Sequence, residues 1–157
     1  MFNVIEAPMD ETKRAIILNL LGHHNIMTLA TIRPDGFPQA TTVYYVNTSF
    51  TLYFGTEATS QKAGNIALNN KVSVAIAGET GNPYKLKALS LSGIATKIVD
   101  SRRSRELQLL LFRAVPGAKR FAPTESNHLF VYSITPVAIS LVDYAAGYGK
   151  TFLDEFD

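Results

Sequence analysis

The stretch Ile26-Met-Thr-Leu-Ala-Thr-Ile-Arg-Pro-Asp-Gly-Phe-Pro-Gln-Ala-Thr-Thr-Val-Tyr-Tyr-Val46 decides the fold class of this chain. Both of its ends are rich in β-branched and aromatic residues, which are typical of β-strands. Between them lies Arg33-Pro-Asp-Gly36, a sequence that favours a tight turn. The stretch therefore predicts a β-hairpin, which is an antiparallel pair of strands.

Outward from this hairpin, the chain continues as short strands with short connections, which favours antiparallel pairing. Gly93 interrupts one long predicted strand and could mark a bulge or a barrel bend. Asp10 and Asp100 are good N-caps for two helices, and a Thr or Ser cap suits a third. The further strands are expected at residues 50–54, 72–77, 86–99, 129–134 and 137–142, and the helices at 10–21, 59–68 and 101–114.

We therefore expect a mainly β fold with peripheral helices, in the form of a small antiparallel barrel. Ile66, Ala67 and Leu68 are expected to anchor the middle helix. A chain of 157 residues with 46% hydrophobic residues fits one globular domain over residues 1–157.

Composition excludes several kinds of chemistry. The chain has no Cys, which rules out disulfides, thiolate catalysis and Cys-ligated metals. The formal net charge of +2 does not indicate a nucleic-acid or membrane partner. The first residues lack the pattern of a secretory signal, and no apolar run is long enough to span a membrane, so we expect a cytoplasmic protein.

Several local motifs do not develop into a site. Gly149-Lys150-Thr151 resembles the end of a P-loop, but the position that should carry the first glycine is Tyr144. His23, His24 and His128 lack metal-binding spacing, so no metal site is expected. Residues 101–120 are rich in Arg and Lys, which fits either a solvated helix face or a surface for an anionic partner.

One segment does carry a functional signal. In Tyr53-Phe-Gly-Thr-Glu-Ala-Thr-Ser-Gln-Lys-Ala-Gly-Asn65, a predicted strand runs into a predicted helix, with Ser60 and Lys62 at the first turn. The start of a helix offers unpaired N–H groups and the positive end of its dipole to an anion. A hydroxyl and an ammonium group there would complete a phosphate site. The alternative is a capped helix with an exposed lysine.

At this point the sequence resembles the pyridoxamine 5′-phosphate oxidase-like, FMN-binding split-barrel proteins. The resemblance runs from about residue 10 to 143 and rests on the order and spacing of several pieces. It implies an antiparallel split barrel and a homodimer that binds FMN in a groove at the subunit interface. The matching pieces include Thr28-Leu-Ala-Thr31, Pro34-Asp-Gly-Phe-Pro38, Thr41-Thr-Val-Tyr-Tyr45, Tyr53-Phe-Gly-Thr56, Thr59-Ser-Gln-Lys62, Asn65, Lys71-Val-Ser-Val74, Leu91-Ser-Gly-Ile-Ala95, Ile134-Thr-Pro136 and Val142-Asp143.

The resemblance also implies a set of cofactor-binding residues. By this match, one strand lines the flavin ring and ribityl chain, the next strand contacts the same ligand, and the helix start holds the phosphate. These three groups are Ala40, Thr41, Thr42 and Val43; Gly55 and Thr56; and Ser60, Gln61 and Lys62. The oxidase itself has an Arg at the positions matching Ala40 and Gln61, and a Gln at the position matching Ala88.

The segments with which the oxidase binds its own substrate have no match here, and the chain has no Trp. We therefore expect an FMN-dependent oxidoreductase that acts on another small molecule, not pyridoxamine phosphate oxidase. There are two alternatives. One is a split barrel that binds F420 or heme, and the other is a flavin-binding protein without turnover. No residue stands out as a catalytic acid or base.

Overall fold

The computed structural model describes residues 9–78, 81–115, 117, 128–145 and 150–152. Its elements in chain order are α1 (Glu11–His23), β1 (Ile26–Ile32), β2 (Pro38–Tyr44), β3 (Val46–Thr48), β4 (Thr51–Glu57), α2 (Gln61–Leu68), β5 (Lys71–Ala77), a short 3-10 helix η1 (Pro83–Lys85), β6 (Lys87–Lys97), α3 (Ser101–Ala114), β7 (Leu129–Asp143) and β8 (Lys150–Phe152).

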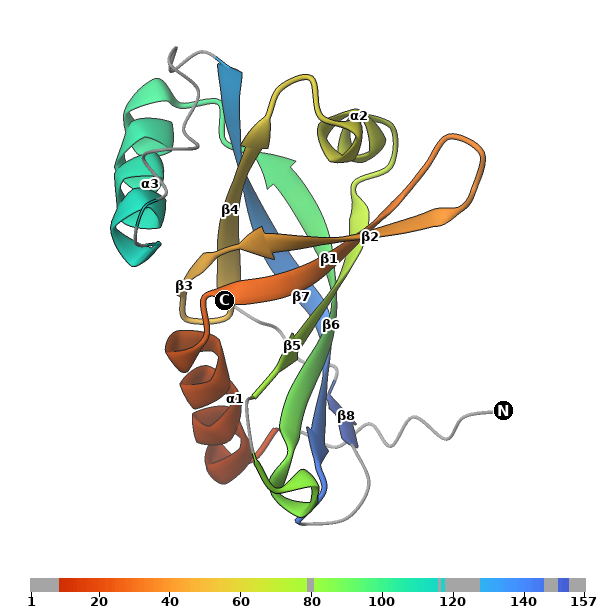
Figure 1. Cartoon of the computed structure of the whole chain (residues 1–157), viewed down its shortest axis with the longest axis vertical. Helices are drawn as coiled ribbons and strands as arrows, with labels where there is room; N and C mark the ends of the chain where they lie inside the picture. The colour runs from red at the N-terminus through yellow and green to blue at the C-terminus, as the bar shows by residue number, and fades with distance from the viewer. Residues whose placement is uncertain (1–8, 79–80, 116, 118–127, 146–149, 153–157) are drawn as a thin grey trace.

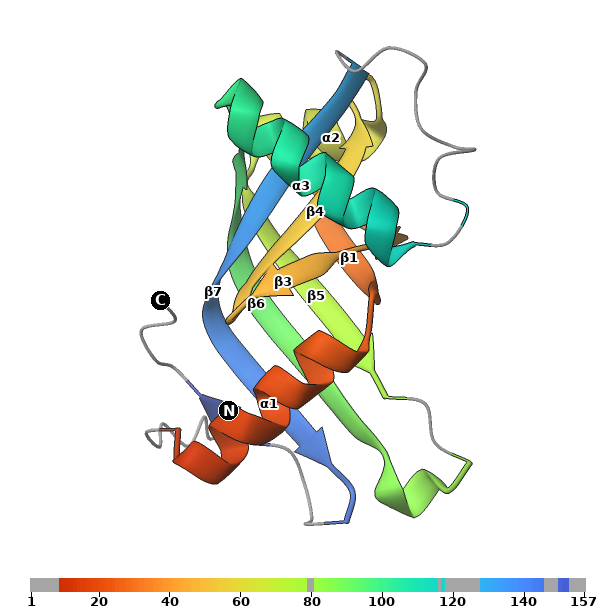
Figure 2. The same ribbon diagram turned by 90° about the vertical axis from the view of Figure 1, so that its left-hand side faces the viewer.

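The strands form one antiparallel sheet in the order β2-β1-β5-β6-β7-β4-β3, with β8 paired to β7. The sheet curls on itself so that β2 approaches β4 (Figure 1). The helices α1 and α3 lie on one side of it, as Figure 2 shows, and α2 lies near one end. This confirms the predicted mainly β split-barrel architecture with peripheral helices.

The predicted hairpin is present, with Ile26 opposite Tyr44 and Ile32 opposite Pro38. Its turn uses Gly36 at a positive φ of 86°, a conformation that glycine adopts without strain. The second strand ends two residues earlier than expected, because Tyr45 is buried and donates its hydroxyl to the Leu21 carbonyl at 2.9 Å. After this anchor the chain starts β3, which pairs with β4.

Gly93 marks a bulge, as expected from the sequence. The pairing between β6 and β7 shifts register there, and Val137 is the extra residue on β7. A Cβ atom at Gly93 would lie 2.7 Å from Cγ2 of Ile134 and 2.8 Å from the Thr135 carbonyl oxygen. The two strands expected at 129–134 and 137–142 are one continuous bent strand, since the bulge absorbs the interruption.

Alternation along the strands gives the sheet an inner face that forms the core. In β5, for example, Val72, Val74 and Ile76 are buried while the residues between them are exposed. The helix α1 adds Ile17, Leu20 and Leu21 to the same core.

The expected anchor of α2 is confirmed for Ile66 and is wrong for Ala67 and Leu68. Ala63 and Ile66, three residues apart, are buried on the packed face of the helix. Ala67 and Leu68 fall on other faces, and Leu68 is 73% exposed. Among the described residues, no helix is long and apolar enough to cross a membrane.

Candidate functional site

The connection from β4 to α2 forms a polar cradle, defined here as Thr56, Ser60, Gln61 and Lys62. Ser60 is the N-cap, and its hydroxyl oxygen accepts a hydrogen bond from the Ala63 amide at 3.2 Å. The Thr56 and Ser60 hydroxyl oxygens lie 3.0 Å apart. The backbone N–H groups of Gln61 and Lys62 belong to the first turn, where an α-helix offers no internal acceptor. The cradle therefore places hydroxyl and backbone N–H donors at the positive end of the helix dipole, and Lys62 belongs to the same first turn.

A relay of side-chain amides supports the cradle. Asn65, which is 2% exposed, donates to the hydroxyl of Thr31 at 3.0 Å and to the side-chain oxygen of Gln39 at 3.1 Å. Gln39 in turn donates to the side-chain oxygen of Gln61 at 2.7 Å. The relay ties the start of α2 to β1 and β2 and holds Gln61 in one place.

Thr41 adds a polar atom that the protein leaves unsatisfied. Its hydroxyl oxygen is buried and has no hydrogen-bond partner among the described residues. Thr41 lies two residues after Gln39 on β2, so both side chains face the same side of the strand. A buried hydroxyl without a partner is costly, and a bound polar ligand would satisfy it.

The structure separates the other predicted ligand residues. Val43 shares the inner face of β2 with Thr41. Ala40 and Thr42 alternate with them and are exposed on the outer face of the strand. Gly55 faces away from the cradle, under α3, where a Cβ atom would lie 3.6 Å from Leu111. Gln39 thus links the cradle to the face of β2 that carries Thr41. Ala40, Thr42 and Gly55 lie on other surfaces.

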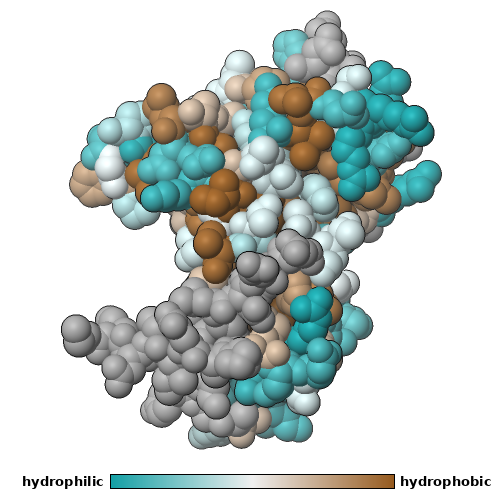
Figure 3. Space-filling model, turned by 180° about the vertical axis from the view of Figure 1, so that it is seen from behind, coloured by the Kyte–Doolittle hydropathy of each residue, from teal (hydrophilic) through white to brown (hydrophobic). Residues whose placement is uncertain are grey.

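The outer face of the sheet carries small side chains in two rows. Residues in each row lie opposite one another on neighbouring strands, and the surface over this part of the sheet is pale with scattered brown patches (Figure 3). The residues of these two rows carry no charge. One row is Thr42, Thr28, Ala75, Ser90 and Ser140; the other is Ala40, Ala30, Ser73, Ser92 and Ala138.

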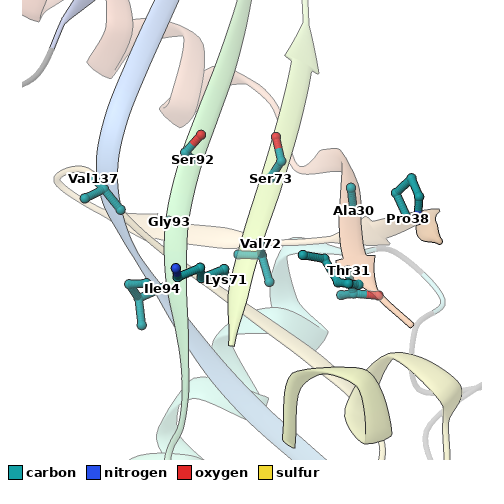
Figure 4. A pocket seen from close by; sticks show the side chains of 11 residues that line it. Ala30, Thr31, Pro38, Lys71, Val72, Ser73, Ser92, Gly93, Ile94 and Val137 are labelled. Carbon is teal, nitrogen blue, oxygen red and sulfur yellow. The ribbon is translucent and has the colours of Figure 1, made fainter. Parts of the chain in front are cut away.

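A groove of about 450 Å³ crosses this face. Figure 4 shows Ser73 and Ser92 side by side on neighbouring strands, with Val137 and Pro38 towards opposite ends. Thr31 also lines the groove and accepts the hydrogen bond from Asn65. The groove and the relay therefore meet at Thr31.

Sequence reasoning did not assign Gln39 or Thr31 to the site. Gln39 could have been found from the period of two along a strand, because it shares a face with Thr41. Thr31 could not, since its role depends on a hydrogen bond to Asn65, which is 34 residues away.

Comparisons with known proteins agree on the fold. A family model described as pyridoxamine 5′-phosphate oxidase matches residues 14–143. A search of curated proteins found no match. Among solved structures, a heme binding protein from Mycobacterium smegmatis has a TM-score of 0.75 and 19% identity, over 94% of this chain and 59% of that chain. An FAD-binding protein from Mesorhizobium loti has a TM-score of 0.68 and 16% identity, over 85% and 94%. An F420 reductase has a TM-score of 0.62 and 26% identity, over 78% and 94%.

Proposed function

The chain belongs to the pyridoxamine 5′-phosphate oxidase family, and from this premise we propose that it is a flavin-dependent oxidoreductase acting on a small molecule. The cofactor is FMN or a relative that carries the same ribityl phosphate. The observation that carries the proposal is the cradle at the start of α2, where the hydroxyls of Thr56 and Ser60 meet at 3.0 Å.

The described residues fit a phosphate-bearing flavin. The cradle supplies donors for phosphate oxygens, with Lys62 as the cation. The unsatisfied hydroxyl of Thr41 offers a further hydrogen bond beside the relay. When bound, a flavin supplies hydride or electron transfer, and the protein supplies position, electrostatics and exclusion of water. We assign no catalytic acid or base.

Heme fits this region less well than a flavin does. Heme iron is held by an axial ligand such as histidine. Among the described residues, neither the cradle nor the groove includes a histidine. A deazaflavin such as F420 needs the same phosphate donors as a flavin and remains an alternative, as does flavin binding without turnover.

We also propose that the working unit is a homodimer, with the outer face of the sheet as its interface. This face combines two rows of small side chains with exposed apolar ones, including Ile26, Tyr44 and Val137 at 47%, 49% and 53% exposure. A second copy on this face would cover these apolar side chains. It would also close the groove that meets the relay at Thr31.

The cradle is tested by the double variant Ser60→Ala with Lys62→Ala, titrated with FMN by flavin fluorescence. Each charge-assisted hydrogen bond to phosphate contributes about 1.5–3 kcal/mol, so the double variant should bind FMN about a hundredfold or more weakly. The matched control, Ser101→Ala with Lys85→Ala, changes an exposed serine and an exposed lysine elsewhere and should leave the affinity unchanged.

An unchanged FMN affinity in the cradle variant would reject the cradle as the phosphate site. Activity is tested separately, by adding NADH or NADPH to the flavin-loaded protein and following loss of the oxidised flavin spectrum. Loss of that spectrum supports an oxidoreductase, whereas a stable spectrum supports a flavin-binding protein without turnover.

A further inference from the structure

We infer that the chain has a second ligand site, which takes a small organic acid that joins one carboxylate to a compact apolar body. The site lies between α2, the C-terminal end of β6 and the N-terminal end of β7, and is called the α2 pocket. The residues that carry the argument are Ala63, Gly64, Ala67, Lys97, Phe130 and Tyr132. The inference goes beyond the proposed function, because none of these residues belongs to the cradle and the ligand is not the flavin.

The α2 pocket exists because the part of the helix that lines it has small side chains. Ala63, Gly64 and Ala67 extend no further than a methyl group, and a cavity of about 310 Å³ remains between the helix and the strands. In Figure 1, α2 lies beside the arrowhead of β6 at one end of the sheet. Sites for small molecules span about 300–1,000 Å³, so this volume suits a ligand of about one ring.

The register of the sheet places a charged side chain on the core face. Lys97 lies opposite Tyr132 on β7, and Tyr132 lies opposite Phe54 on β4. Residues directly opposite each other in an antiparallel sheet point to the same side. Tyr132 is 3% exposed and its ring stacks on that of Phe54, with 5.3 Å between the centroids, so this side is the core. Lys97 therefore leaves the sheet on its core face, at the last residue of β6.

The ammonium group of Lys97 lies over an aromatic ring of the α2 pocket. Its Nζ is 3.1 Å from the centroid of the half-buried Phe130 ring, a cation–π contact that favours this position. Lys97 itself is exposed, so the charge lies where a ligand can reach it from solvent. The ion pairs of the described residues do not include Lys97. An ammonium has three N–H donors, so donors remain for an anion when one side faces the ring.

A carboxylate on an apolar body matches both parts of the α2 pocket. Among the described residues that line it, Lys97 alone carries a charge, which favours a ligand with one negative charge. The carboxylate oxygens would accept charge-assisted hydrogen bonds from the ammonium. The body of the ligand would lie against Phe130, Tyr132 and the alanines of α2, where burial of apolar surface favours binding.

The test measures the binding of benzoate and of its neutral counterpart benzamide by NMR titration of the isotope-labelled protein as purified. We expect benzoate to shift the backbone amide signals of Ala67 and Tyr132, which lie in the α2 pocket. Benzoate should bind about tenfold more tightly than benzamide, the effect of about one charge-assisted hydrogen bond.

Three variants locate the binding. Lys97→Met removes the ammonium and keeps a long side chain, so it should weaken benzoate about tenfold and leave benzamide unchanged. The matched control Lys62→Met removes the cation of the cradle and should leave benzoate binding unchanged. Ala67→Leu fills the α2 pocket from an exposed helix position with a strong helix former, and should weaken both ligands. Thermal unfolding checks that all three variants remain folded.

Each outcome has a defined reading. Absence of benzoate binding by the wild-type protein, or equal affinities for benzoate and benzamide, would overturn the inference. Loss of benzoate binding in Lys62→Met but not in Lys97→Met would also overturn it, because the anion would then lie at the cradle. None of these results bears on FMN binding, which the cradle variant tests separately.

Discussion

Asn65 gives the sharpest test of how the fold supports the site. The variant Asn65→Ala removes two hydrogen bonds, to Thr31 at 3.0 Å and to Gln39 at 3.1 Å. Each contributes about 1 kcal/mol, and the Thr31 hydroxyl, in a residue that is 1% exposed, loses a donor. We expect a loss of about 2–3 kcal/mol in the free energy of unfolding, which lowers Tm by about 5–10 °C for a domain of this size.

The same variant should weaken flavin binding by up to about tenfold, because Gln61 loses the support of the relay. Urea unfolding gives the stability and fluorescence titration gives the affinity. The control Asn47→Ala removes one exposed hydrogen bond, to the Ser49 carbonyl at 2.9 Å, and should cost about 0.5 kcal/mol. Equal stabilities of the two variants would refute the assignment of Asn65 as a buried tie between α2 and the sheet.

Two further changes test the fold itself. Gly93→Ala should destabilise by about 1–3 kcal/mol in urea unfolding, because its Cβ would lie 2.7 Å from Ile134; a neutral effect would contradict the close approach at the bulge. Tyr45→Phe removes the bond to the Leu21 carbonyl and should cost about 1 kcal/mol. Burial raises the pKa of Tyr45 above its ordinary value of 10.0, so the neutral form is favoured in the folded state. The free energy of unfolding should therefore fall as the pH rises above 10, and Tyr45→Phe should flatten that fall.

Most of the fold could be predicted from local patterns. The cap at Asp100 and the helix Ser101–Ala114 match the prediction residue for residue, because capping and hydrophobic periodicity are local signals. The gap between the two strands expected at 129–134 and 137–142 contains Pro136, and proline, which has no N–H to donate, is uncommon inside a strand. In the structure Pro136 pairs opposite Gly93 at the bulge. This pairing joins residues far apart in the sequence, so local sequence patterns cannot predict it.

The site was less predictable than the fold. Ser60 could be identified because a cap followed by a helix is a local pattern. Successive side chains along β2 point to opposite faces, which puts Ala40 and Thr42 on the outer face. The resemblance to the family assigned four consecutive residues to the ligand and did not take this alternation into account. The relay through Gln39 and Asn65 joins residues 26 positions apart and becomes visible only once α2 is packed on the sheet.

The central claim is that this chain binds a phosphate-bearing flavin. The most direct measurement is the absorbance spectrum of the protein purified without added ligand, together with the mass of any cofactor released on denaturation. We predict oxidised flavin bands and a released flavin that carries a phosphate. A Soret band with released heme, or a colourless protein that stays colourless after incubation with FMN and FAD, would contradict the claim.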